Sequence, residues 1–166
     1  MTPEQAKFLA QVVGQQLQQE WMTTYKVINA IPEAKKDYKP DANSRSAWDL
    51  AQHVAIADVG FLHAIIANDF AKFGTAAPAA TTIADLAEWY KHEFPKALEQ
   101  MLALDGNHLS QIVEAWGVMK LPSAAYAMFC NNHMIHHRGQ LAAYLRPMGG
   151  KVPSIYGGSF DEKFGG

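Results

Sequence analysis

The stretch Asn131–Leu145 reads NNHMIHHRGQLAAYL and holds three of the chain's seven histidines within five residues. At about 100° per residue on a helical wheel, His133 and His137 lie about 40° apart, on the same arc as apolar Leu141. His136 lies about 100° away from His137, on the flank of the helix. The pattern therefore predicts a helix that turns its apolar arc and two of these histidines toward the interior of a helical bundle.

Three further segments show apolar residues at helical spacing, and each begins with a residue that favours the start of a helix. Thr2-Pro3-Glu4-Gln5 is a capping box with proline at the first helical position, and Ser46, Thr82 and Ser123 are the other expected N-caps. We expect helices at about residues 3–30, 47–70, 82–104 and 123–146.

With no convincing alternating strands, these four helical patterns predict an all-α fold, a four-helix bundle in one domain over residues 1–166. Residues 105–122 are left unassigned, as either an extended segment or a short helix. Residues 147–166 are rich in glycine and proline and are expected to form an irregular tail.

Composition limits the classes of function. The 166 residues are 49% hydrophobic, which is enough for a core that needs no disulfide or metal to fold. The net charge is −2 without any basic run, so we expect no nucleic-acid partner. The single Cys130 forms no internal disulfide, which fits a reducing compartment. We find no signal peptide and no long uninterrupted apolar run, so we expect a cytoplasmic protein without a membrane partner.

Two imidazoles one helical turn apart can hold one metal ion between them, and this is why a His-x-x-x-His pair indicates a metal site. Such a site needs a third ligand from another helix, and His53 fits best because it shares the apolar arc of the second helix. The alternative is that His133 and His137 are hydrogen-bonded core residues. Cys130 is a weaker candidate ligand, and Asp49 either orients His53 or only caps its helix.

Three segments together resemble the DinB family of four-helix-bundle metalloproteins: SAWDLAQHVA (46–55), HMIHHRGQLAAYLR (133–146) and GGKVPSIYGGSFDE (149–162). The resemblance implies that His53, His133 and His137 bind a divalent metal, nickel or zinc. It also implies a homodimer. Some members of the family are thiol-dependent S-transferases or isomerases that use glutathione, bacillithiol or mycothiol.

Three histidine ligands leave coordination positions open, which suits a catalytic metal better than a structural one. The first interpretation is therefore a metal-dependent S-transferase that acts on a small-molecule thiol. A metal-dependent hydrolase and a non-catalytic metal-binding or stress-response protein are the alternatives. No inward glutamate near the three histidines is evident in the sequence, which argues against the hydrolase.

Overall fold

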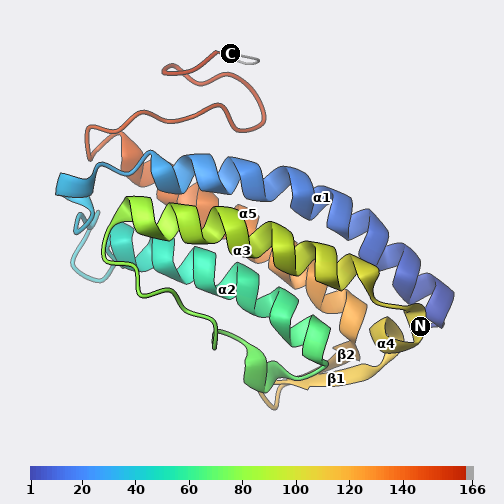
Figure 1. Cartoon of the computed structure of the whole chain (residues 1–166). Helices are drawn as coiled ribbons and strands as arrows, with labels where there is room; N and C mark the ends of the chain where they lie inside the picture. Colours follow the sequence, from blue (N-terminus) through green and yellow to red (C-terminus); the bar gives the residue numbers. More distant parts are fainter. Residues whose placement is uncertain (164–166) are drawn as a thin grey trace.

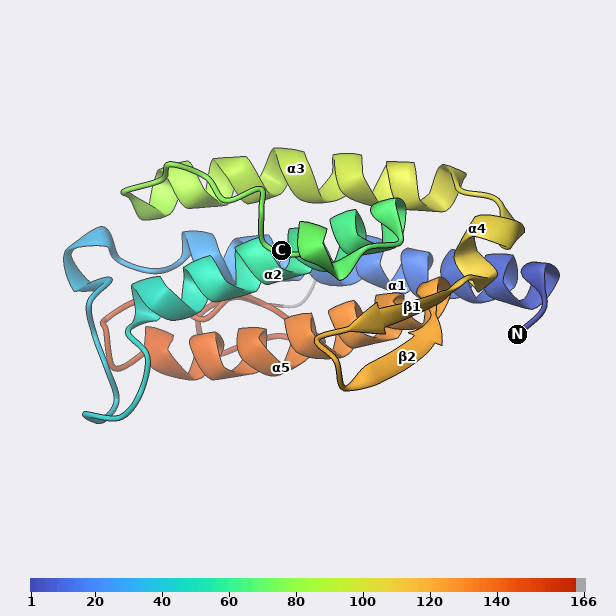
Figure 2. The same cartoon turned by 90° about the horizontal axis from the view of Figure 1, so that it is seen from below.

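The computed structural model describes residues 1–163 and is dominated by four long helices (Figure 1). These are α1 (Pro3–Asn29), α2 (Ala47–Ala67), α3 (Ile83–Ala103) and α5 (Tyr126–Leu145). α1 and α2 each pack against both α3 and α5. α1 and α5 run in one direction and α2 and α3 in the other, so the connection between α2 and α3 returns along the bundle (Figures 1 and 2). The predicted all-α four-helix bundle is confirmed.

The starts of the first three helices follow their capping residues. Thr2 and Gln5 form the predicted capping box, and the side chains of Ser46 and Thr82 each accept a hydrogen bond from the backbone three residues later. The prediction that Ser123 caps the last helix is wrong. Ser123 lies in the 3-10 turn Ser123–Ala125, and its buried hydroxyl donates instead to the carbonyl oxygen of Ile65 at 3.4 Å.

All four helices end before the expected residue, by three residues in α2 and by one in each of the others. α1 ends at Asn29, followed by the 3-10 turn Glu33–Lys35. α2 ends at Ala67 and not at residue 70, because Asn68 adopts a left-handed conformation with φ of 52°. That conformation terminates a helix, and asparagine tolerates it better than most residues. The next residues form a second 3-10 turn, Phe70–Lys72.

Residues 105–122, which could not be assigned from the sequence, contain two strands. The expectation of a fold without strands is wrong on this point. A short helix, α4 (Gly106–Ser110), leads into an antiparallel hairpin of β1 (Ile112–Ala115) and β2 (Met119–Pro122). Residues 116–118 join the strands, and Trp116 and Gly117 have φ values of 52° and 70°. Two successive positive φ values match the turn type that best continues the twist of two paired strands.

α2 is the most apolar of the four helices. It is long and apolar enough to cross a membrane by length and composition alone, with a mean hydropathy of 1.5, but 67% of that window is buried within the bundle. Burial on nearly all sides explains this composition, because a helix surrounded by other helices needs little polar surface.

The described part of the C-terminal tail, residues 147–163, has no helix or strand, as predicted. It is nevertheless attached to the bundle. The hydroxyl of Tyr156 donates to Glu20 on α1 at 3.0 Å and accepts from Arg138 on α5 at 2.7 Å. Arg138 is buried and also forms an ion pair with Glu20. The tail therefore contacts the buried charge of Arg138, the residue that follows His137 in the sequence.

Candidate metal site

The structure brings His53, His133 and His137 together at the contact between α2 and α5. The Nε2 atom of His53 lies 3.0 Å from Nε2 of His133 and 3.2 Å from Nε2 of His137. All three residues are half-buried, and one ring nitrogen from each lies within 4.8 Å of the others. α2 supplies the first histidine from its second turn, and α5 supplies the other two one turn apart.

Hydrogen bonds hold the outer ring nitrogens of two of these histidines. His137 Nδ1 lies 2.8 Å from Oε1 of Gln140, which can only accept, so Nδ1 donates. The lone pair of His137 is therefore on Nε2, toward the centre of the group. His133 Nδ1 lies 2.8 Å from Oδ1 of Asp58. When Asp58 is ionised it can only accept, and His133 then also presents an unprotonated Nε2.

Asp58 is a completely buried acid on α2 that the sequence analysis missed. The hydroxyl of Tyr90 on α3 donates to its second oxygen at 3.0 Å. Burial raises the pKa of Asp58, while the Tyr90 hydrogen bond and the charge of Arg138 act in the opposite direction. Its position could have drawn attention to it, because Asp58 is the acid within the apolar part of α2, and a buried acid needs polar partners inside the protein.

Asp49, which the sequence analysis considered as a partner of His53, serves the start of α2. Its carboxylate accepts from the Ser46 hydroxyl at 2.7 Å, and its backbone N–H donates back to that hydroxyl at 3.0 Å. The structure therefore favours the capping interpretation of Asp49. Asp58 occupies the orienting position instead, and its partner is His133.

The surroundings keep the three imidazoles neutral. Burial lowers the pKa of His133 to about 4, and the charges of His136 and Arg45 add to this effect. Burial also lowers the pKa of His53 to about 4, with smaller contributions from His133, Arg45 and His137. Burial lowers the pKa of His137, although the hydrogen bond that its ring donates to Gln140 acts in the opposite direction. Neutral imidazoles are the form that binds a metal ion.

The nitrogen spacing fits a metal ion. Two histidine nitrogens on one tetrahedral zinc lie about 3.3 Å apart, given bonds of about 2.05 Å. The Nε2–Nε2 separations of 3.0 and 3.2 Å are close to this value. In the metal-free protein a neutral His53 protonated on Nε2 can donate a hydrogen bond to one of the other two Nε2 atoms at this distance. The arrangement therefore suits a cation held by three imidazoles, with at least one coordination position left for another molecule.

The remaining candidate residues lie outside this group. Cys130 is buried, with its Sγ 3.5 Å from the carbonyl oxygen of Asp58. His136 is exposed on the flank of α5, as predicted. His92 is exposed on α3, and His108 lies 3.0 Å from the carbonyl oxygen of Ile65. His63 is half-buried further along α2 and does not join the three histidines.

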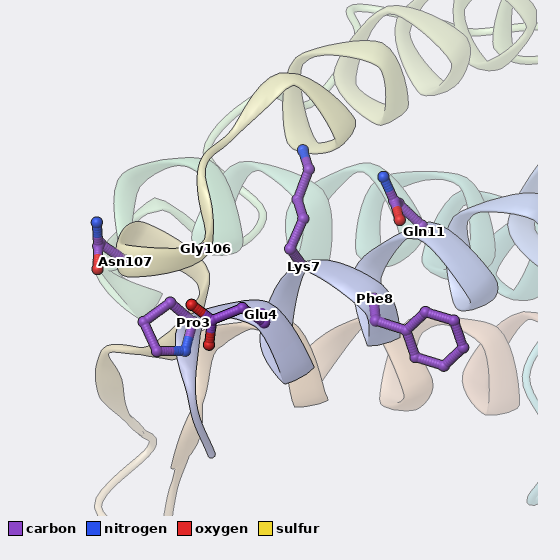
Figure 3. A pocket seen from close by; sticks show the side chains of 7 residues that line it. All are labelled: Pro3, Glu4, Lys7, Phe8, Gln11, Gly106 and Asn107. Atoms are coloured by element: carbon purple, nitrogen blue, oxygen red, sulfur yellow. The ribbon is translucent and has the colours of Figure 1, made fainter.

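A separate hollow of about 460 Å³ lies at the end of the bundle where α1 begins (Figure 3). Its one lysine, Lys7, is already engaged, because the ammonium group donates to the carbonyl oxygens of Leu102 and Leu104 at the end of α3. Its one acid, Glu4, belongs to the first turn of α1. The hollow shares no lining residue with the three histidines, so we place the functional site elsewhere.

Fold and site together define a four-helix-bundle protein with a three-histidine group of the kind that can hold a metal ion. The sequence profile of the DinB family matches residues 6–163. The chain belongs to the DinB family. This agrees with the resemblance of the three sequence segments.

Individual relatives support the same conclusion. YrdA, an uncharacterised protein of Bacillus subtilis strain 168, is 29% identical over 149 residues, which cover 86% of each chain. The crystal structure of the DinB-like protein YjoA from Bacillus subtilis superposes with a TM-score of 0.72 at 22% identity, over 91% of this chain and 98% of that one. A DinB-like protein from Bacillus cereus gives a TM-score of 0.69 at 22% identity, over 86% and 94%. These structures show a shared fold.

Proposed function

We propose that the chain binds one divalent metal ion, nickel or zinc, through His53, His133 and His137 and acts as a metal-dependent S-transferase on a small-molecule thiol. The convergence of three neutral Nε2 atoms carries the proposal, since their separations of 3.0 and 3.2 Å match a shared ion. Three nitrogen ligands do not choose between nickel and zinc, because relative affinity and availability decide this.

The chain's own residues would prepare the site for this chemistry. Asp58 and Gln140 fix the rings of His133 and His137, so that both Nε2 atoms are held in position before anything binds. The three histidines are only half-buried, and a hollow opens beside His137. A bound divalent ion with an open position favours the thiolate form of a thiol, which is the nucleophilic form.

The hydrolase alternative has less support in the structure. Metal-dependent hydrolysis commonly uses a carboxylate or a histidine near the ion as a general base. Asp58 contacts one of the three histidines, and both of its carboxylate oxygens are already hydrogen-bonded, to His133 and Tyr90. Because it is buried behind His133, it does not face the open side of the site.

Metal analysis of single variants tests the ligand set. Replacing any one of His53, His133 and His137 by alanine removes a third of the ligands, so each variant should lose most of its metal on purification. His136→Ala is the matched control, because it removes an exposed histidine from the same helix. His63→Ala is a second control and should also retain metal. A His133→Ala protein that keeps its full metal content would contradict the site.

The thiol preference is tested on the intact site with cobalt in place of the native metal. Addition of a small thiol should produce a sulfur-to-cobalt charge-transfer band in the near ultraviolet, because the open position accepts the thiolate. No change with any thiol would count against the transferase and favour a non-catalytic metal-binding protein. We also propose a homodimer in the cytoplasm, on the basis of the family resemblance and the sequence.

A further inference from the structure

A second hollow, of about 270 Å³, opens directly beside His137. Its walls come from the end of the loop before α2, from the first turn of α2 and from the second half of α5. Apart from His137, the lining residues are Ser44, Arg45, Leu50, Gln140 and Tyr144. A molecule in this hollow could therefore contact one of the three histidines and an arginine at the same time.

Arg45 is exposed, and within residues 1–163 its side chain forms no ion pair or hydrogen bond. The other two arginines of the chain have carboxylate partners: Arg138 forms an ion pair with Glu20, and Arg146 with Asp161. The charge of Arg45 nevertheless reaches the site, because it lowers the pKa of all three histidines, behind the larger effect of burial. A guanidinium group with no partner suits a planar anion, which it can bind through two parallel hydrogen bonds.

The other polar groups of the hollow favour an anion as well. Gln140 uses its oxygen to accept from His137, so its two N–H groups remain as donors. The Tyr144 hydroxyl is a further possible donor. No aspartate or glutamate lines the hollow. The acid next to it in the loop, Asp41, is exposed, and its carboxylate is occupied by Ser44 and Asn43.

We propose that this hollow binds a carboxylate group of the substrate and that Arg45 is the residue that selects for it. The inference rests on the proposed function, which it narrows: the thiol that reaches the three histidines carries a carboxylate a few bonds away from its sulfur. Arg45 holds the carboxylate, and because Arg45 and His137 line the same hollow, one small molecule can contact both.

Two thiols of similar size test this selection on the cobalt-loaded protein. The affinities of 3-mercaptopropionate, which carries a carboxylate, and of 2-mercaptoethanol, which does not, are measured from the cobalt absorption bands. We expect the former to bind about tenfold more tightly, since a charge-assisted pair supplies an effect of this order. The ratio of the two affinities should fall close to one in Arg45→Gln and be partly retained in Arg45→Lys.

Lys39→Gln is the matched control, because it removes one positive charge from the same loop at an exposed position outside the hollow. It should leave the ratio unchanged. Equal affinities for the two thiols in the unaltered protein would overturn the inference and leave the thiol function standing. A lowered ratio in Lys39→Gln equal to that in Arg45→Gln would also overturn it, by showing a general effect of charge. No band with either thiol would contradict the proposed function itself.

Discussion

At the scale of single residues, Asp58 connects the packing of the bundle to the orientation of His133. It is fully buried between α2, α3 and α5 and is bound by groups from two of them. A buried acid is costly unless its oxygens have partners. The fold satisfies both oxygens, and one of the two bonds holds the ring of His133. Asp58 thus links the packing of three helices to the orientation of one candidate ligand.

Replacing Asp58 with asparagine should weaken metal binding without removing it. The amide keeps the shape of the side chain but is a poorer acceptor for His133 Nδ1–H, so the ring loses basicity and a fixed orientation. Partners of this kind typically change metal affinity by about 10- to 100-fold. Competition with a chelator of known affinity measures the change. Asp49→Asn is the control, because that acid only caps α2, and its metal affinity should be unchanged.

At the scale of secondary structure elements, the prediction from sequence was accurate where local signals act. Thr2, Ser46 and Thr82 start their helices because a side-chain oxygen next to an apolar pattern satisfies free N–H groups. The hairpin was missed because its strands have four residues each and its turn has Trp116 in a conformation that non-glycine residues seldom adopt. That turn is supported by contacts with Phe61, Phe70 and Phe73, which are distant in the sequence.

The residues of the candidate site also fall into those that local sequence patterns predict and those that they do not. His133 and His137 are one turn apart on one helix, so their common direction follows from helical geometry alone. His53 could be chosen because it shares the apolar arc of its own helix. Asp58 and Arg45 could not be placed, since their relation to the histidines depends on how α2 packs against α5 and how the preceding loop returns. These are tertiary relations that no local pattern encodes.

Two glycines in helices provide an element-scale test of the packing. At Gly60 of α2, an added Cβ would lie 2.7 Å from the backbone nitrogen of Gly74, which belongs to the connection between α2 and α3. At Gly139 of α5 an added Cβ meets nothing within 4 Å. We expect Gly139→Ala to stabilise the fold by about 0.5–1 kcal/mol, from helix propensity. Gly60→Ala should destabilise it by about 1–3 kcal/mol, as overpacking does. Urea unfolding of both variants measures the difference, and equal effects would contradict the close contact.

On the scale of the whole molecule, exposed apolar side chains are relevant to the proposed homodimer. Phe8 and Val12 lie one turn apart on α1 and are 68% and 40% exposed. Met128 and Phe129 are exposed on α5. Light scattering at micromolar concentration should therefore give about twice the mass of the 18.3 kDa chain. A mass equal to one chain would refute the dimer.

Stability, metal and pH are linked through the same three histidines. An ion that binds only the folded protein should raise its free energy of unfolding by about 2.7 kcal/mol when its concentration is 100 times the dissociation constant. For a chain of this size that corresponds to a rise in Tm of roughly 5–10 °C. The metal-free protein should still be folded at pH 7.5, because its core does not depend on the site. A metal-free protein that is unfolded at pH 7.5 would make the site chiefly structural.

The pH at which this stabilisation disappears follows from the lowered pKa values. Free histidine titrates near 6.5, and from that alone metal release would begin near pH 6. In the folded protein the pKa of His53 and of His133 is about 4, so protons compete with the metal only at lower pH. The same pKa values also affect the metal-free protein. Between pH 6.5 and about 4 its unfolded chain binds more protons than the folded protein does, so the free energy of unfolding falls as the pH falls. Melting curves of both forms at pH 7.5, 5.5 and 4.5 should show the difference in Tm persisting at pH 5.5 and shrinking at 4.5. Its loss already at pH 5.5 would mean that the three imidazoles titrate as if they were exposed, which contradicts the converging, half-buried arrangement.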